Sequence, residues 1–175
     1  MHLMLSSWMS VHQILHRHRV TSAGQRGGGL ALVRRDIIKA TTIHIGIYTS
    51  SSHWPSGLPV AAPSPVVVYV YRPPGTVIST FTDQLADMLN QIVLLSARFV
   101  VVVDLNAPGI ASGQLDPHAV DMFSQYGLCQ HVTGPTHASG NALDLILSHD
   151  EQINQQLITN VAVQSVCFSD HHLLT

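Results

Sequence analysis

Apolar residues recur along the chain in two patterns, one typical of strands and the other of an amphipathic helix. Phe81, Leu85, Met88, Ile92 and Leu95 recur at intervals of three and four, which predicts a helix with one apolar face. Short runs of consecutive or β-branched apolar residues instead predict strands. These runs are LALV at 30–33 after a triple glycine, 41–48, 66–71, 99–103, 128–132, 142–147 and 157–163.

Polar residues and glycine mark the ends of two predicted helices. Thr80 with Asp83 resembles a capping box in which Asp replaces the usual Glu. A second, shorter helix is predicted over 117–126, because Asp116 precedes a proline at its start and Gly127 follows its end. Helices and strands thus alternate irregularly, with three strands before the first helix and three after the second. This order favours an α/β or α+β sandwich over a strictly alternating parallel sheet.

Composition and charge limit the classes of protein to which the chain can belong. The chain has 175 residues, enough for one domain, of which 46% are hydrophobic and only 10% charged. The net charge of −2 lacks the strongly basic character of a typical nucleic-acid binder, so any such binding must be local. Cys129 and Cys167 stand apart, and no apolar run approaches the length of a membrane span. We therefore expect an intracellular, soluble protein without a signal peptide.

The N-terminal 26 residues differ from the rest. They are rich in His, Ser and Arg, and their helical period is too faint to predict a structure. Five arginines precede the first acidic residue, Asp36, which leaves a transit peptide as an alternative to a chance composition. We expect residues 1–26 to be a degenerate or weakly ordered remnant, and 27–175 to form a truncated domain.

Polar residues with catalytic potential follow the ends of the predicted strands, where active sites of layered α/β folds gather. Asp144 interrupts the apolar run ALDLILS and must find a partner or face solvent. A histidine next to an aspartate, as in the SDHH run, suits an imidazole held in one tautomer for proton transfer. The candidates are Tyr71, Asp104, Asn106, Asp144, Asp170 and His171.

Four stretches carry a family resemblance. VYRPPGT, FVVVVDLNAPG, YGLCQHVTGPTHASGNALDLILS and FSDHHLLT resemble, in this order, the YRPP, GDFN, GLxQHVxxPTHxxGxxLDLV and SDHxxV stretches of LINE-type retrotransposon proteins. QRGGGLALV similarly echoes GRGGGVA. The chain thus resembles, from about Gly27 onwards, the endonuclease/exonuclease/phosphatase domain of non-LTR retrotransposon and reverse transcriptase polyproteins. The resemblance implies a four-layer αββα sandwich, here N-terminally truncated, that hydrolyses DNA phosphodiesters with Mg²⁺ or Mn²⁺.

The resemblance also implies roles for single residues. Asp104 matches the Asp of GDFN and would orient the attacking water or assist the leaving oxygen, while Asn106 would bond to the scissile phosphate. Tyr71 would touch the phosphate. His171 matches the His of SDH and would contact the phosphate or act as a base, with Asp144 fixing its orientation.

The metal site is where the chain departs from the family. Asp170 would be a metal-side ligand, but the family's metal-binding Glu, in a segment often reading LTETWL, has no clear counterpart. Aligning Trp8 with that segment places Ser6 at the Glu, and Glu151 is the only glutamate of the chain. Val103 also replaces the Gly of GDFN, and Leu105 its Phe. We therefore expect weakened Mg²⁺ binding and a weak or inactive nuclease.

Further expectations concern partners and rival functions. The resemblance implies a nuclear protein with DNA as its partner, no membrane association, no small-molecule cofactor and a monomeric state. One rival function is zinc binding through His12, His16 and His18, the first two at i and i+4 of a possible helix. The other is a non-catalytic remnant that binds nucleic acid or a protein through its sheet surface and N-terminal arginines.

Overall fold

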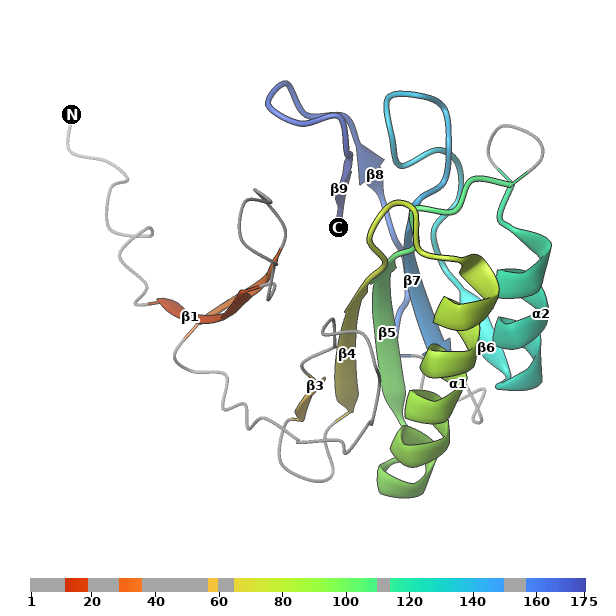
Figure 1. Cartoon of the computed structure of the whole chain (residues 1–175). Coiled ribbons are helices and arrows are strands. Elements are labelled where there is room, and N and C mark those ends of the chain that lie inside the picture. Colours follow the sequence, from red (N-terminus) through yellow and green to blue (C-terminus); the bar gives the residue numbers. More distant parts are fainter. Residues whose placement is uncertain (1–11, 19–28, 36–56, 60–64, 110–113, 150–156) are drawn as a thin grey trace.

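The computed structural model of the chain describes residues 12–18, 29–35, 57–59, 65–109, 114–149 and 157–175 (Figure 1). The first three ranges are described by their backbone alone. Within these residues, a five-stranded sheet carries two helices on one face, and two short two-stranded sheets lie outside it. The predicted α/β class is confirmed.

The five-stranded sheet has the strand order β3-β4-β5-β7-β6. β4 and β5 are parallel, and every other neighbouring pair is antiparallel. Parallel neighbours need a long crossover connection, which the first helix, α1, supplies. The strands of this sheet are β3 (Gly57–Pro59), β4 (Val66–Tyr71), β5 (Phe99–Asp104), β6 (Leu128–Gln130) and β7 (Asp144–His149).

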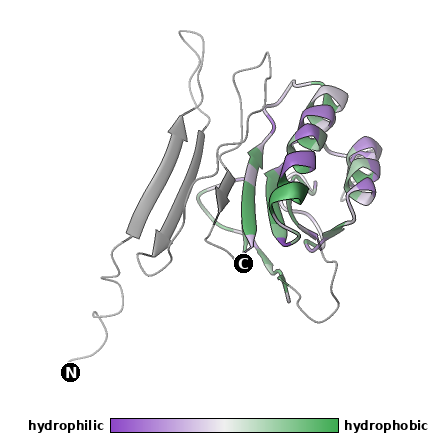
Figure 2. Ribbon diagram, turned by 90° about the horizontal axis from the view of Figure 1, so that it is seen from below, coloured by the Kyte–Doolittle hydropathy of each residue, from purple (hydrophilic) through white to green (hydrophobic). Residues whose placement is uncertain are grey.

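The helices α1 (Ile78–Leu95) and α2 (Pro117–Gln125) pack side by side against the same face of this sheet (Figure 1). In Figure 2 their hydrophobic sides face the strands and their hydrophilic sides point outward. The hydrophobic core lies between the helices and the sheet, and its side chains are inaccessible to solvent. Its largest members include Leu85, Met88, Leu89 and Ile92 of α1 with Val68, Phe99, Val101, Leu145 and Leu147 of the sheet.

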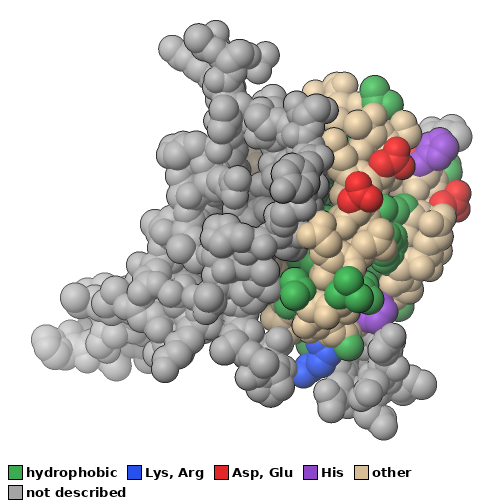
Figure 3. Space-filling model, turned by 60° about the horizontal axis from the view of Figure 1, so that its bottom comes forward, with side chains coloured by type: hydrophobic (Ala, Val, Ile, Leu, Met, Phe, Trp, Pro, Cys, Tyr) green, Lys and Arg blue, Asp and Glu red, His purple; other side chains and the backbone are tan. Residues whose placement is uncertain are grey.

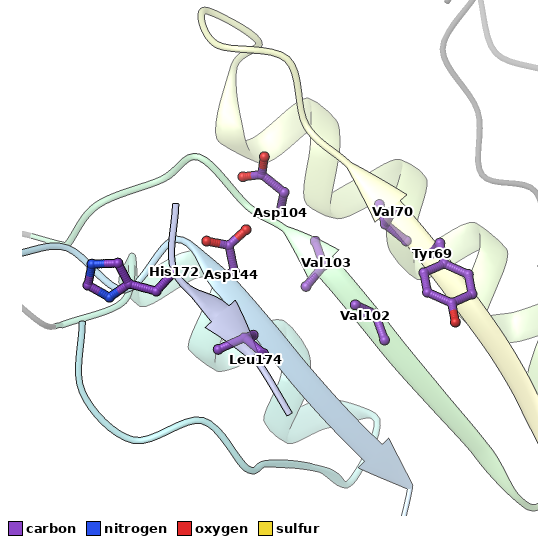
Figure 4. A pocket seen from close by; sticks show the side chains of 8 residues that line it. All are labelled: Tyr69, Val70, Val102, Val103, Asp104, Asp144, His172 and Leu174. Atoms are coloured by element: carbon purple, nitrogen blue, oxygen red, sulfur yellow. The ribbon is translucent and has the colours of Figure 1, made fainter. Parts of the chain in front are cut away.

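Alternation along the strands assigns the remaining side chains to the opposite face. Val66, Val68 and Val70 are buried against the helices, so the half-buried Tyr69 and Tyr71 point the other way. On that side lies the strand β9 (Leu173–Leu174), which pairs antiparallel with β8 (Val163–Gln164). A cavity of about 200 Å³ separates the sheet from β9, lined by Tyr69, Val70, Val102, Val103, Asp104, Asp144, His172 and Leu174 (Figure 4).

The second helix follows its predicted caps, whereas the first does not. The Asp116 carboxylate accepts a hydrogen bond from the His118 backbone N–H at 2.9 Å, and Gly127 adopts a positive φ of 60° after the helix. The predicted capping box of α1 is wrong, because the helix begins at Ile78 and Thr80 already lies inside its first turn. Val77 takes the N-cap position without any side-chain cap bond.

Several predicted strands also need correction. The strand predicted at 157–163 is reduced to β8, and β9 was not predicted. β3 lies between the strands predicted at 41–48 and 66–71, where the sequence analysis predicted no strand. The strand predicted at 41–48 lies outside the described residues, whereas the one at 30–33 is confirmed as β2 (Gly29–Arg35).

The N-terminal part of the chain contains a strand where the zinc hypothesis assumed a helix. β1 (His12–His18) pairs antiparallel with β2. In a strand, residues four apart are separated by about 13 Å, compared with about 6 Å on a helix. His12 and His16 therefore lack the i, i+4 helical spacing on which that hypothesis rested, and this part of it is wrong.

Candidate functional site

Three candidate residues lie side by side across the sheet. The register pairs Tyr71 of β4 with Asp104 of β5, and Asp104 with Asp144 of β7. All three are half-buried and belong to the face opposite the helices, because they alternate with buried core residues. Figure 4 shows both carboxyl groups at the same end of the strands, beside the cavity. The sheet topology thus brings together residues that are up to 73 positions apart in the sequence.

His171 joins this row from a loop near the C-terminus. Its Nδ1 lies 2.8 Å from Oδ2 of Asp144, and the two side chains are 35% and 21% exposed. Backbone hydrogen bonds hold the loop in place. Ala138 N–H donates to Asp170 O at 2.8 Å, and His172 N–H donates to Thr136 O at 2.7 Å. The PTH and SDH stretches therefore lie against each other.

Thr136 fixes the backbone at the start of β7. Its side chain is fully buried, and its Oγ1 accepts hydrogen bonds from the backbone N–H groups of Leu143 and Asp144, both at 2.9 Å. A hydroxyl oxygen has two lone pairs, so Thr136 satisfies two backbone donors at once, one buried and one partly buried. The sequence analysis did not single out Thr136, although it stands in the PTH stretch. Only the fold reveals that it meets residues seven and eight positions away.

Arg72 and Asn106 hold the loop that follows Asp104. The guanidinium of Arg72 donates to the carbonyl oxygens of Leu105 (3.0 Å), Asn106 (2.7 Å) and Thr76 (2.8 Å). Asn106 returns a hydrogen bond from Nδ2 to Arg72 O at 3.1 Å and has a positive φ of 47°, a conformation that Asn tolerates better than most residues. This locked turn keeps Asn106 next to Asp104.

The electrostatics of the row raise the pKa values of both Asp104 and His171. Burial, together with the negative charge of Asp144, raises the pKa of Asp104 to about 6, although His171 and hydrogen bonds with Asn106 oppose the rise. Burial alone would lower the pKa of His171. The hydrogen bond and charge of Asp144, with the charges of Asp104 and Asp170, outweigh burial and raise it.

A second cluster adjoins the first. His137 Nε2 lies 3.3 Å from Asp170 Oδ2, and the His137 ring meets the His171 ring edge-on at a centroid distance of 5.0 Å. Asp170 is much more exposed than Asp104. Hydrogen bonds from its own backbone and from His137 lower its pKa. Sequence analysis missed His137, although it too stands in the PTH stretch.

Two groups of side chains could hold a cation. One comprises Asp104, Asp144 and His171, and the other His137, Asp170 and His171. In the first group, Oδ1 of Asp104 is buried and has no hydrogen-bond partner among the described residues. An unpaired carboxylate oxygen beside a second carboxylate suits a hard divalent cation, which prefers oxygen ligands. The donor set therefore fits such an ion, with few protein ligands to hold it.

The structure thus brings most of the sequence candidates together. Tyr71, Asp104 and Asp144 form one row, His171 bonds to it, and Asn106 lies at its edge. Asp170 belongs to the neighbouring group. Ser6 and Glu151, the positions that bear on the absent glutamate, lie outside the described residues.

The arrangement resembles several solved structures. One is the endonuclease domain of TRAS1, a telomere-specific non-LTR retrotransposon, with 16% identity over 93% of this chain and 76% of that one, at a TM-score of 0.65. The cytolethal distending toxin of Haemophilus ducreyi matches at 19% identity over 92% and 66%, with a TM-score of 0.56. An endonuclease/exonuclease/phosphatase family protein from Leptotrichia buccalis matches at 13% identity over 95% and 71%, with a TM-score of 0.55. At these identities the likeness establishes the fold alone, and it confirms the expected sandwich class.

The chain spans about two thirds to three quarters of these structures. Among the curated proteins none matches significantly. Within the described residues no helix has the length and apolar character needed to cross a membrane. Residues 66–175, more than half of the chain, match the family model described as endonuclease-reverse transcriptase. They include every candidate from Tyr71 to His171, and the chain belongs to this family, within the endonuclease/exonuclease/phosphatase superfamily.

Proposed function

We propose that this chain is a metal-dependent phosphodiester hydrolase that nicks DNA, with low activity. The observation that carries the proposal is the row of Asp104 and Asp144 with His171 hydrogen-bonded at its end. Two carboxylates and an oriented imidazole at one end of neighbouring strands can handle protons, bind a cation and stabilise a negatively charged transition state. Family membership supports the same reaction class.

Asp104 is the proposed proton acceptor for the attacking water. Its pKa of about 6 lies close to neutral pH, where a general base works best. Asn106, held by Arg72, keeps the carboxyl group oriented through its hydrogen bonds. In the alternative role, the protonated Asp104 would assist the leaving oxygen, and its pKa suits that role as well.

His171 is the proposed cationic contact to the scissile phosphate. Asp144 holds Nδ1, so Nε2 is the ring nitrogen left to point to substrate. A raised pKa keeps the imidazolium charged near neutral pH. We favour this contact over the base role for His171 for that reason. Tyr71, the direct neighbour of Asp104, would donate its hydroxyl hydrogen to a phosphate oxygen.

A divalent cation, Mg²⁺ or Mn²⁺, would be held by Asp104 and Asp144 in one group, and Asp170 of the neighbouring group is the further metal-side carboxylate that we propose. When bound, such an ion supplies Lewis-acid stabilisation of the phosphate charge. Mg²⁺ in proteins is commonly held by only one or two carboxylates plus water, so each missing carboxylate matters. Because no glutamate precedes Glu151, we expect weak binding and a low rate of cleavage.

DNA binding would depend on residues outside the row. Arg72 and Arg98 are the only cationic residues other than histidine after residue 64, and Arg72 is bound to the backbone. Figure 3 shows acidic and histidine side chains among uncharged ones on the described part of one face, with a cationic side chain at its lower edge. Contacts to the DNA backbone would therefore fall to the arginines before residue 36. We further propose a domain over 27–175, a monomer, and a nuclear location.

A plasmid-nicking assay with the full chain tests the proposal. Supercoiled DNA incubated in Mg²⁺ or Mn²⁺ should be converted slowly to open circles, and EDTA should stop the conversion. Asp104→Ala and His171→Ala should each lower the rate at least a hundredfold, in the range typical of a lost acid–base group or charge-stabilising donor, about 10²–10⁴. Asp83→Ala and His118→Ala, on the exposed sides of α1 and α2, are the matched controls.

Cleavage that survives both active-site substitutions would contradict the proposal, and so would wild-type protein without cleavage. In the second case the chain would be a non-catalytic remnant. DNA retention that falls steeply with salt would then identify a nucleic-acid-binding role.

A further inference from the structure

His137 is held in one tautomer by the loop that follows it. The backbone N–H of Ser139 donates to Nδ1 of His137 at 3.0 Å, and the Ser139 hydroxyl lies 2.7 Å from the same nitrogen. The Ser139 hydroxyl oxygen in turn accepts from Nδ2 of Asn141 at 3.0 Å, which leaves its hydrogen for Nδ1. A backbone N–H can only donate, so Nδ1 must accept, and the proton of the neutral ring resides on Nε2.

The protonated Nε2 faces Asp170. It lies 3.3 Å from Oδ2 of this carboxylate, whose side chain is 72% exposed. The His137 side chain is only 20% exposed, because its ring packs edge-on against His171 with an interplanar angle of 82°. The backbone bridge between His137 and His171 fixes both rings at this separation. The half-buried ring of His137 thus contacts both the exposed Asp170 carboxylate and the neighbouring imidazole of His171.

A transition-metal site at His137, Asp170 and His171 is the obvious competing interpretation. A metal ligand must offer a lone pair, whereas Nε2 of His137 carries the proton as long as Ser139 donates to Nδ1. Metal binding there would require this loop bond to break. The hydrogen-bond pattern consequently favours a donor to Asp170 over a ligand.

We infer that His137 is a positioning residue of the site, which orients the Asp170 carboxylate through Nε2–H and supports the ring of His171. This inference deepens the proposed function, since Asp170 is the proposed metal-side carboxylate and His171 the proposed phosphate contact. The inference thus gives the PTH stretch a role in the site through His137, which does not line the cavity.

The tautomer can be measured without any catalytic activity. Long-range ¹H–¹⁵N correlation spectra of the metal-free full chain at pH 7.5 should show His137 with a proton on Nε2 and a bare Nδ1. Ring signals of His171 should shift when His137 is changed, because the two rings are in contact. A proton on Nδ1 of His137 would overturn the inference.

Two substitutions of His137 by residues with amide side chains distinguish the role of Nε2 from that of Nδ1. His137→Gln can present an N–H near the original Nε2 position and so retain the donor to Asp170. His137→Asn can still accept from Ser139 through its Oδ1 but has no group that reaches Asp170. Mn²⁺ affinity, measured by electron paramagnetic resonance of the free ion, should fall severalfold in His137→Asn and recover towards the wild-type value in His137→Gln.

The outcomes distinguish this inference from the proposed function. Equal Mn²⁺ affinity in the wild type and both variants, with an unmoved His171 signal, would overturn the positioning role. A wild-type chain that binds no Mn²⁺ would contradict the proposed metal-dependent function, and the tautomer and the His171 signals would still decide the inference. Tight zinc binding that disappears in both variants would replace it with the transition-metal site.

Discussion

Replacement of Asp104 by asparagine should stabilise the metal-free protein at pH 8, although it removes the proposed base. Burial and the charge of Asp144 raise the pKa of Asp104 to about 6 from 3.8. A carboxyl group whose pKa is higher in the folded than in the unfolded protein favours folding only while it is protonated. Its contribution is complete below about pH 4 and is lost as the pH rises through about 6.

The size of the effect follows from the two pKa values. The pKa of Asp104 differs by about two between the folded and unfolded protein, and a pKa difference of one corresponds to about 1.36 kcal/mol. The free energy of unfolding can therefore fall by at most about 3 kcal/mol between pH 4 and pH 8. Asp104 remains partly exposed, so solvent screening lowers the expected effect to about 1–2 kcal/mol. The introduced amide carries no charge, and its N–H₂ group can donate to Asp144 across the strands.

Urea unfolding followed by far-ultraviolet circular dichroism, in EDTA at several pH values from 4.5 to 8, measures this difference. Asp104→Asn should exceed the wild type in free energy of unfolding at pH 8 and approach it at pH 4.5. The thermal midpoint should rise by roughly 2–4 °C per kcal/mol for a chain of this size. Asp83→Asn, at an exposed position of α1, is the matched control and should show no such pH dependence.

The reasoning would be refuted by an Asp104→Asn protein that is less stable than the wild type at pH 8. A stability gain of equal size at pH 4.5 and pH 8 would also refute it, because a pH-independent gain cannot come from an ionised carboxylate. Addition of Mn²⁺ provides a further check, since it should stabilise the wild type more than the variant.

Substitutions at three other positions test two parts of the site and the end of the second helix. Thr136→Val should lower the free energy of unfolding by about 2–4 kcal/mol, because two buried backbone N–H groups lose their acceptor, whereas Thr136→Ser should lose only about 1 kcal/mol for one buried methyl group. Both values are measurable by urea unfolding. Asp144→Asn should lower the pKa of His171 in a metal-free NMR titration, because the charge and hydrogen bond that raise it are weakened; an unchanged pKa would contradict the assigned cause. Gly127→Ala should cost about 1 kcal/mol in unfolding experiments, since the residue has a φ of 60° and an L-residue is strained there.

Local signals predicted those parts of the fold that depend on neighbours in sequence. The second helix has the predicted N-cap, proline and terminal glycine, because capping involves residues only two or three positions apart. The apolar period of the first helix identified its buried face, but the Thr80–Asp83 pattern misplaced its beginning. The chain there begins the helix at Ile78 without any side-chain cap, so the capping pattern carried no information about the start.

The site depends on contacts between distant residues, and the sequence predicted it only through motifs. Their places at predicted strand ends made Asp104, Asp144 and His171 candidates, and the resemblance supplied their roles. Their proximity follows instead from strand register and from the loop bonds around Thr136. No local pattern indicates that a threonine will meet two N–H groups seven and eight positions away. His137 was missed for the same reason, since its partner Asp170 lies 33 positions further along the chain.

The pairing of Asp104 with Asp144 provides a way to distinguish a nuclease from a non-catalytic binding remnant. Like charges directly opposite each other on neighbouring strands destabilise a sheet, and burial increases the cost at Asp104. A cation offsets such a pair, as protonation of Asp104 also does, and His171 contributes a cation through Asp144. A second cation at the unpaired oxygen of Asp104 would stabilise the fold by RT ln(1 + [M]/Kd), which makes Mn²⁺-dependent stability a direct measure of Kd. Stabilisation that begins only at millimolar Mn²⁺, then grows with the logarithm of the Mn²⁺ concentration, and disappears in Asp104→Asn would therefore support a working but weak metal site. Stability unaffected by Mn²⁺ would assign the row to a remnant that retains the geometry without the ion.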